Sequence, residues 1–245
     1  MTIPFGTGLL GVRRAQTDAE VQAAQALRHR CFFGADGVDA DALDARCEHW
    51  LIGGAGGPVA TFRTQVFASG RALGDSYAAA RYGLAPLRGV GTPLIEVGRF
   101  CIAPGVRDAD VMRLAWAALA RLVDEAGAAF LFGCSSFAGC DPVRHEAALT
   151  FLANRHLGPV GMRPLRLTGE RFSLRPGPVE GKMALAQLPG LLRSYLGMGG
   201  WVSDHGVIDR DMDTCHVFTA LPVAAIPPRR AAALRAIAGL EEAVV

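Results

Sequence analysis

The sequence has few of the features that mark membrane-spanning or exported proteins. Its longest apolar runs, such as residues 126–133 (AGAAFLFG), are much shorter than the roughly 20 residues that a helix needs to cross a bilayer. The first 14 residues (MTIPFGTGLLGVRR) lack the order of charge, apolar core and cleavage site that defines a signal peptide. We therefore expect a cytoplasmic protein.

Cysteine is present but not in a pattern that binds metal or forms disulfides. The six cysteines, at positions 31, 47, 101, 134, 140 and 215, make no CxxC pair and no repeated spacing. A disulfide framework is not expected in a chain of 245 residues without an export signal. Zinc usually takes closely spaced ligand pairs, and neither these cysteines nor the six histidines provide one. We expect no metal.

Lysine is almost missing, because Lys182 is the single lysine among 25 basic residues. Between Arg144 and Lys182, basic residues far outnumber acidic ones. Such a stretch suits an acidic partner, a phosphate group or an anionic membrane surface. It is equally typical of arginines that only meet water, so the charge alone leaves the partner open.

The first half of the chain predicts alternating strands and helices. Thr17 begins a helix as its N-cap, and Glu20 completes a capping box. Val21, Ala24 and Leu27 then recur at helical spacing. Strands are expected at 8–15, 49–54, 59–67, 94–103 and 129–137, with a hairpin turn at 55–58, an acidic loop at 36–44 and a long helix at 109–127.

In the second half, Asp141 and Pro142 predict the N-cap and first turn of a helix over 142–156. An irregular basic insertion at 160–187 follows, then a helix at 188–197, a loop rich in Asp and Gly, a strand at 216–223, and a tail helix within 228–245. With no repeats and no long linker, we expect one domain over 1–245. Its fold class is α/β (α+β), with a mixed, mostly antiparallel sheet flanked by helices.

Four segments carry a resemblance to a known family: 27–33 (LRHRCFF), 95–108 (IEVGRFCIAPGVRD), 133–142 (GCSSFAGCDP) and 188–214. In this order they resemble the ornithine–acyl-carrier-protein N-acyltransferases, which make lyso-ornithine lipid and have the GNAT fold. A weaker similarity links the chain to acyl-homoserine lactone synthases. Those carry further acidic residues and a tryptophan where this chain has Cys47, Glu48 and His49, which argues against lactone formation.

The resemblance implies a GNAT-like acyltransferase fold whose two central strands splay apart to admit a thioester. Gly98 and Gly133 suit that expectation, since glycine within a strand often marks a close backbone approach. Glu96 is the expected catalytic base, which deprotonates the attacking amine. A structural ion pair with Arg99 is the alternative for this glutamate. Cys134 is expected to be a small packed residue and not a nucleophile, because no histidine stands at a Cys–His spacing.

The donor is predicted from what the turn after the fourth GNAT strand contains. Enzymes of this fold that use coenzyme A normally have a glycine-rich loop there, whereas residues 104–110 (PGVRDAD) have one glycine and two acids, which disfavour a pyrophosphate. We therefore expect the acyl group to arrive on the 4'-phosphopantetheine of acyl carrier protein, with no separate cofactor. Arg107, Arg144, Arg155, Arg163 and Arg166 are candidates to meet that acidic partner.

The acceptor, L-ornithine, has one carboxylate and two amines. A planar guanidinium is the natural partner of its carboxylate, which favours Arg63 or Arg99 over Arg28. Asp44 or Glu48 could bind the distal amine, and Asp209 belongs to a second acidic group with Asp204, Asp211 and Asp213. The full set of expected substrate-binding residues is Arg28, Phe32, Asp44, Arg63, Arg99, Phe100, Ser135 and Ser136.

The predicted function is therefore the transfer of a long-chain acyl group, 3-hydroxylated in the expected form, from acyl carrier protein to the α-amine of ornithine. Acylation of another amino acid such as glycine, lactone-synthase-like chemistry and a non-catalytic carrier- or lipid-binding module are the alternatives. The tail helix has a basic and an apolar face and could contact the inner face of a membrane. No nucleic-acid partner is expected.

Overall fold

The computed structural model describes residues 3–5, 10–106 and 108–240, and Arg107 lies outside them. The chain divides into two compact units. The first contains residues 1–66, 97–128 and 227–245, and the second contains residues 67–96 and 129–226. The single domain over 1–245 stays a prediction.

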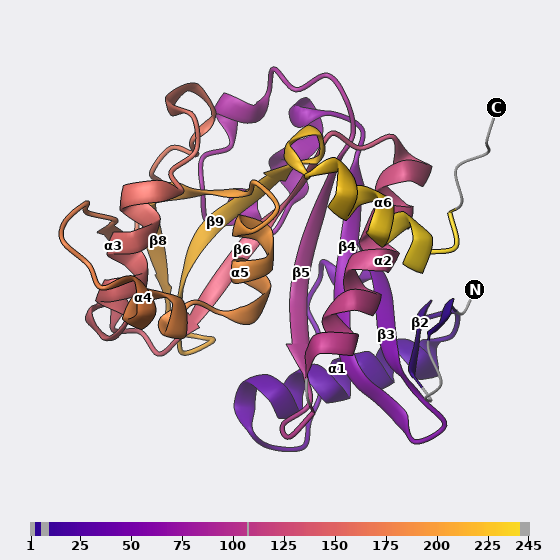
Figure 1. Cartoon of the computed structure of the whole chain (residues 1–245). Helices are drawn as coiled ribbons and strands as arrows, with labels where there is room; N and C mark the ends of the chain where they lie inside the picture. The colour runs from indigo at the N-terminus through magenta and orange to yellow at the C-terminus, as the bar shows by residue number, and fades with distance from the viewer. Residues whose placement is uncertain (1–2, 6–9, 107, 241–245) are drawn as a thin grey trace. The chain divides into compact units, whose positions relative to one another are not determined.

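The first unit is built on antiparallel strands (Figure 1). β1 (Ile3–Phe5), β2 (Leu10–Arg14), β3 (Glu48–Gly54) and β4 (Gly57–Phe67) pair in sequence order. The C-terminal part of β5 (Leu94–Ile102) also belongs to this unit. Just after β5, Ala103 donates its amide to the carbonyl of Val59 in β4, at 2.8 Å. The helices are α1 (Asp18–Phe33), the 3-10 turn η1 (Asp44–Arg46), α2 (Asp108–Ala126) and α6 (Pro228–Ile237).

The predicted start of the first helix is confirmed. Thr17 is the N-cap of α1, and its hydroxyl accepts the Glu20 amide at 3.3 Å. The Glu20 carboxylate reaches back to the amide of Gln16 at 2.6 Å, one residue before the N-cap. The helix ends at Gly34, whose φ of 69° needs a residue without a Cβ. Ala24 and Leu27 are buried on the predicted apolar face.

The tail helix α6 packs against α2. Leu234 on α6 and Ala238 just after it are buried, and Arg235 makes a bidentate ion pair with Asp124 of α2 at 2.8 Å through each nitrogen. The apolar side of α6 is therefore used for packing within the first unit. Residues 241–245 of the predicted tail lie outside the described residues.

The second unit has the strand order β5-β6-β9-β8-β7. β6 (Phe130–Ala138) pairs antiparallel with β9 (Thr214–Pro222), which pairs with β8 (Trp201–Asp209), and β8 with β7 (Arg171–Ser173). The parallel register between β5 and β6 joins Leu94–Glu96 to Phe130–Phe132, three of the nine residues of each strand. Among the described residues this register ends at Glu96 and Phe132, and the remaining residues of β5 belong to the first unit.

Short turns and helices complete the second unit (Figure 1). The 3-10 turns are η2 (Gly70–Asp75), η3 (Ala78–Ala80), η4 (Ala85–Leu87), η5 (Pro142–His145), η6 (Val160–Met162) and η7 (Val223–Ala225). The α-helices are α3 (Glu146–Arg155), α4 (Gly181–Gln187) and α5 (Gly190–Leu196). Within the described ranges, no helix is both long and apolar enough to cross a bilayer.

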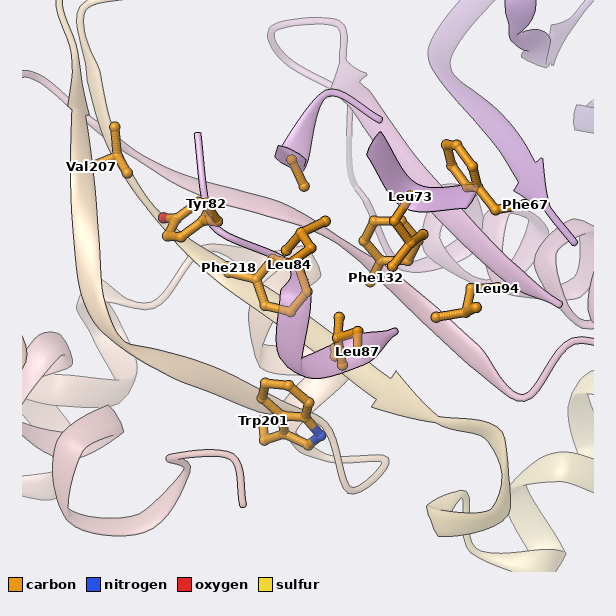
Figure 2. Close-up of a cluster of buried hydrophobic side chains, with 12 residues drawn as sticks. Phe67, Leu73, Tyr82, Leu84, Leu87, Leu94, Phe132, Trp201, Val207 and Phe218 are labelled. Atoms are coloured by element: carbon orange, nitrogen blue, oxygen red, sulfur yellow. The ribbon is translucent and has the colours of Figure 1, made fainter. Parts of the chain in front are cut away.

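Two apolar clusters form the core of the second unit. The segment between β4 and β5 supplies one side of the first cluster, and β6, β8 and β9 supply the other (Figure 2). Phe218 is its centre, with ring centroids 6.0 Å from Phe132 and 5.9 Å from Trp201. The second cluster contains Phe137, Leu149, Leu152, Leu192 and Val217 and joins α3 and α5 to the sheet.

Three predictions about the second half need correction. The Asp- and Gly-rich stretch expected to be a loop is strand β8, which was missed because its buried residues include Ser203, His205 and Asp209. The basic insertion 160–187 contains strand β7 and helix α4. Asp141 does cap, accepting the Val143 amide at 3.0 Å, but it caps the 3-10 turn η5, and α3 begins only at Glu146.

Candidate active site

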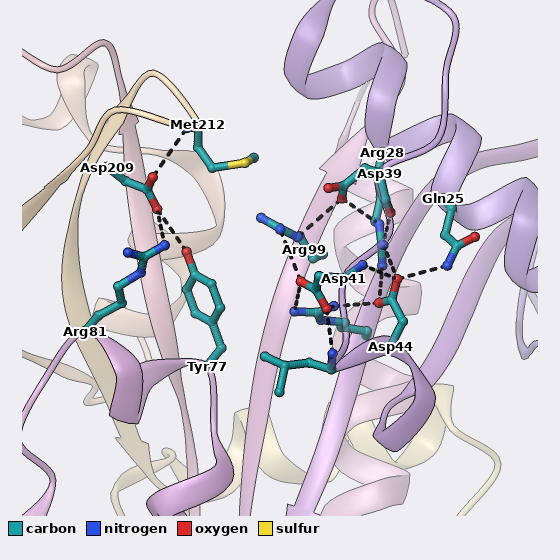
Figure 3. Close-up of polar contacts among 12 residues, drawn as sticks. Gln25, Arg28, Asp39, Asp41, Asp44, Tyr77, Arg81, Arg99, Asp209 and Met212 are labelled. Atoms are coloured by element: carbon teal, nitrogen blue, oxygen red, sulfur yellow. Dashed lines mark hydrogen bonds and ion pairs between the residues drawn. The ribbon is translucent and has the colours of Figure 1, made fainter.

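Asp44 is the centre of a buried ionic cluster in the first unit (Figure 3). Its carboxylate accepts two hydrogen bonds from Arg28, at 3.0 and 2.7 Å, and one from Arg63 at 2.5 Å. Gln25 adds a fourth at 2.9 Å. Burial alone would raise the pKa of this carboxyl, but the guanidinium hydrogen bonds outweigh it and hold the pKa well below its usual range.

Two more aspartates of the acidic loop belong to the same cluster. Asp41 makes a bidentate pair with Arg63, at 2.7 and 2.9 Å, and accepts a bond from Arg99 at 3.3 Å. Asp39 lies 2.9 Å from Arg28 Nε and 3.3 Å from Arg99 Nε. Three guanidinium groups and three carboxylates therefore balance one another, as a buried ionic group requires.

Arg99 differs from the other two arginines of the cluster. Its side chain is 15 % exposed, compared with 1 % for Arg28 and 4 % for Arg63. Its φ is 53°, in the left-handed region that is uncommon for a residue with a side chain. Its guanidinium lies 5.9 Å from the ring centroid of Phe32. A positive φ within β5 interrupts the strand's alternation and redirects the side chain.

The structure brings together five of the predicted substrate-binding residues in this unit: Arg28, Phe32, Asp44, Arg63 and Arg99. Arg28 and Asp44 are nearly inaccessible to solvent and paired with each other, which gives them a structural role that the sequence did not indicate. Phe100 packs its ring against Phe62, 6.1 Å between centroids. Glu48, the other residue expected to bind the distal amine, pairs instead with Arg14 at 2.9 Å.

Glu96 belongs to the second unit, where two backbone amides hold its carboxylate. Tyr77 donates its amide to Oε2 at 2.9 Å, and Ala78 donates to Oε1 at 2.8 Å. The residue is 5 % exposed. One amide on each carboxylate oxygen fixes the orientation of the group.

A second set of contacts holds the turn that supplies those amides (Figure 3). The Tyr77 hydroxyl donates to Asp209 at 3.1 Å, and Arg81 pairs with the same carboxylate oxygen at 3.1 Å. The Arg81 guanidinium also lies 5.5 Å from the Tyr77 ring centroid. Asp209 is buried and accepts the Met212 amide at 3.3 Å. Asp209 on β8 thus anchors η3, and η3 orients Glu96.

The residues of the 133–142 segment point to different faces of β6. Burial raises the pKa of the Cys134 thiol well above its usual value, and the nearby Glu96 carboxylate adds to this effect. A protonated thiol of this kind is a poor nucleophile. Ser136 is two residues after Cys134, so it lies on the same face of β6, and it is exposed. Ser135 is on the other face, where its oxygen accepts the Thr219 hydroxyl at 2.9 Å.

Sequence reasoning missed five residues that the structure places around these sites: Asp39, Asp41, Tyr77, Arg81 and, as a buried anchor, Asp209. The acidic loop was a usable signal for the first two, since Asp39 and Asp41 contact the same arginines as Asp44 does, and Arg99 as well. No pattern pointed to Tyr77 or Arg81, because the segment between β4 and β5 has no helical or strand period. Among the described residues, no group of three or more His, Cys, Asp or Glu is arranged to hold a metal ion.

Comparison with known proteins identifies the family. The model of the acetyltransferase (GNAT) domain matches residues 23–117. An L-ornithine N(alpha)-acyltransferase of Rhodobacter capsulatus is 31% identical over 88% of this chain and 90% of its own length. The chain belongs to the L-ornithine N(alpha)-acyltransferase family. A member from Rhizobium meliloti is 32% identical over 90% of this chain and 82% of its own length.

Membership in this family confirms the resemblance predicted from the four segments and makes the chain an acyltransferase of GNAT-like α/β fold. Solved structures are less similar. BjaI, a CoA-dependent acyl-homoserine lactone synthase, is 12% identical over 91% of this chain and 83% of its own, with a TM-score of 0.49. FeeM, an N-acyl amino acid synthase from uncultured soil microbes, is 12% identical over 88% and 91%, with a TM-score of 0.45.

Proposed function

We propose that this protein transfers a long-chain 3-hydroxyacyl group from acyl carrier protein to the α-amine of L-ornithine, giving lyso-ornithine lipid. The observation that carries the proposal is the family: four curated relatives, 28% to 32% identical over about nine tenths of this chain, are named L-ornithine N(alpha)-acyltransferases. In the proposed reaction the amine nitrogen bonds to the thioester carbon, and the carbon–sulfur bond breaks.

Glu96 is the proposed base. An α-ammonium group is mostly protonated at neutral pH and must lose a proton before it can attack a thioester. A carboxylate of fixed orientation can take that proton, directly or through water, and return one to the departing thiolate. The amides of Tyr77 and Ala78 support this role because they hold both carboxylate oxygens in one orientation.

A carrier-protein donor is the second part of the proposal. The turn after β5 contains Pro104 and Gly105, and α2 then begins at Asp108. Asp110, in the first turn of α2, is exposed and pairs with Arg113 at 3.2 Å. A helix start of this acidic composition disfavours a pyrophosphate, whereas an acyl carrier protein presents a single phosphate on its pantetheine arm.

For the acceptor, we propose Arg99 as the partner of the ornithine α-carboxylate, since it is the most exposed guanidinium of the ionic cluster. The distal amine is assigned to Asp41, whose side chain is 29 % exposed compared with 8 % for Asp44. Burial alone would raise the pKa of the Asp41 carboxyl, but the hydrogen bonds from Arg63 outweigh burial and the net pKa is lowered. The carboxyl therefore stays ionised at neutral pH. The buried residues Arg28, Arg63 and Asp44 then hold these two residues in position through the ion pairs of the cluster.

The direct test is incubation of the purified protein with long-chain acyl carrier protein and a panel of amino acids, followed by mass spectrometry. We expect ornithine to give the dominant N-acyl product, and acyl-CoA and S-adenosylmethionine to be poor partners. Equal turnover with acyl-CoA would contradict the proposed donor. A dominant product with glycine would move the protein to the alternative acceptor.

The role of Glu96 is tested by Glu96→Gln, which should lower kcat by roughly two to four powers of ten. Tyr77→Phe keeps the amide donor and removes only the hydroxyl that binds Asp209, so we expect a loss of about tenfold or less. Glu146→Gln, at an exposed position on α3, is the matched control. Near-normal turnover of Glu96→Gln would remove this residue from the reaction.

A further inference from the structure

The loop between α3 and β7 exposes large apolar side chains to solvent. Val160, Leu165 and Leu167 are 81%, 55% and 40% exposed. Single exposed apolar residues are common on protein surfaces, but three within eight residues of one loop form a group that is typical of an interaction site. We call residues 159–171 the arginine–leucine loop.

The two leucines of this loop lie side by side over Gly83. Gly83 and Leu165 exchange backbone hydrogen bonds, each of 2.8 Å. A Cβ placed on Gly83 would lie 3.0 Å from the Leu165 Cβ and 3.5 Å from the Leu167 Cδ2. The missing side chain therefore lets both leucines rest on the backbone as one apolar patch. The loop is also fixed at η6, where Met162 packs against the core cluster.

The surroundings of the patch are strongly basic. Arg163, Arg166 and Arg171 belong to the loop, and Arg175 follows β7. Glu170 is the single carboxylate of the loop, and Arg210 neutralises it through a bidentate pair of 2.6 Å contacts. The loop therefore presents uncompensated positive charge next to exposed leucines.

Some N–H groups of these arginines already donate hydrogen bonds to acceptors within the protein. Arg163 donates to the Gly158 carbonyl, Arg166 to the Ser173 hydroxyl at 2.8 Å, and Arg171 to the carbonyls of Thr168 and Arg81 at 3.0 and 3.1 Å. These bonds hold the loop in shape and leave each positive charge in place. Fewer N–H groups remain for bidentate pairs with individual carboxylates. The loop therefore attracts an anionic surface through its summed positive charge more than through specific hydrogen bonds.

We propose that the arginine–leucine loop binds the surface of an anionic lipid bilayer. Leu165 and Leu167 enter the boundary between headgroups and acyl chains, while the arginines remain at the level of the lipid phosphates. Leu234 of the tail helix is already buried in the packing of α6 on α2. The inference deepens the proposed function in one respect, because a single-chain acyl-amino acid is an amphiphile that leaves the enzyme into a membrane.

The test is flotation of the full-length protein with vesicles of phosphatidylcholine, with and without about 30 mol % phosphatidylglycerol. We expect binding to the anionic vesicles that weakens as salt is raised, and little binding to neutral ones. Leu165→Ser with Leu167→Ser should weaken binding by about tenfold or more, since the half-exposed leucines lose their insertion. Arg166→Gln with Arg175→Gln should weaken binding and flatten its salt dependence.

The matched control is Met183→Ser with Leu185→Ser on α4, two apolar side chains that are 52% and 44% exposed but lie outside the loop. This pair should bind vesicles as the unchanged protein does. Equal loss in both double variants, or no binding of the unchanged protein to anionic vesicles, overturns the proposal. So does a loop variant that keeps vesicle binding but loses affinity for holo-acyl carrier protein, which would make the loop a carrier-docking surface.

Turnover with soluble acyl carrier protein in the absence of vesicles separates this inference from the proposed function. The leucine variant should keep that turnover, since none of its changed residues belongs to the proposed catalytic machinery. If the unchanged protein shows no acyl transfer but binds anionic vesicles through the loop, the proposed function fails and the membrane surface stands.

Discussion

Removing Arg28 should destabilise the protein far more than removing an exposed arginine of the same helix. Arg28→Met takes away both hydrogen bonds to Asp44 and the 2.9 Å contact with Asp39, and leaves two carboxylates that are each 8 % exposed with fewer cationic partners. Breaking a buried ion pair from one side costs about 3–5 kcal/mol. For a chain of this size that corresponds to a fall in Tm of roughly 6–20 °C.

The assay is thermal unfolding followed by circular dichroism, with Arg30→Met as the control. Arg30 is half-exposed, and its partner Asp36 is 4.0 Å away and almost fully solvated, so the loss of Arg30 should cost about 0.5 kcal/mol or less. Arg28→Met combined with Asp44→Leu should be less destabilised than the sum of the two single changes, because each single change leaves the other member of the Arg28–Asp44 pair buried without it and the double change does not. A Tm of Arg28→Met equal to that of Arg30→Met would refute the structural role of Arg28. In that case the weaker alternative from the sequence, a contact of Arg28 with the ornithine carboxylate, predicts a raised KM for this variant.

Three further predictions follow from buried or capping groups. Cys134→Ala should keep turnover within about twofold. At about pH 7.5, iodoacetamide should modify Cys31 before Cys134, which mass spectrometry can follow. The reason is that contact with Cys101 lowers the pKa of Cys31 to about 7, while burial raises the pKa of Cys134. Burial lowers the pKa of His216 from 6.5 to about 4, so the unfolded chain binds a proton first as the pH falls between these values. Stability should therefore decrease with falling pH across that window, and His216→Gln should remove about 3 kcal/mol of the decrease in urea titrations. Asp141→Ala should cost about 1 kcal/mol in thermal unfolding through the lost cap, and Asp211→Ala about 0.5 kcal/mol or less.

The elements that the sequence predicted well are those with a local signal. Thr17 and Glu20 mark the start of α1 by their own side chains, and β3, β4, β5 and β6 are apolar runs bounded by glycine, proline or charge. The helix α2 carries a long apolar stripe. In each case the residues that define the element are neighbours along the chain, so the pattern can be recognised without knowing what the element packs against.

The features that were missed depend on partners distant in sequence. β8 was predicted as a loop because Ser203, His205 and Asp209 are polar, yet each is buried by strands and turns that sequence spacing does not reveal. The two amides that hold Glu96 come from residues nearly 20 positions earlier, in a segment with no period of its own. Glu96 could be chosen from its family motif, but its binding partners required the fold.

The left-handed backbone of Arg99 affects how this position must be studied by mutagenesis. An alanine there removes the guanidinium and retains an unfavourable φ, whereas a glycine removes the guanidinium and relieves the backbone, a difference of about 1 kcal/mol. Because Arg99 itself already has this φ, the alanine variant measures the loss of the guanidinium alone, whereas the glycine variant adds the relief of the backbone and understates that loss. The loss in Arg99→Ala therefore belongs to the side chain, and the difference between Arg99→Ala and Arg99→Gly reports the strain of the left-handed backbone.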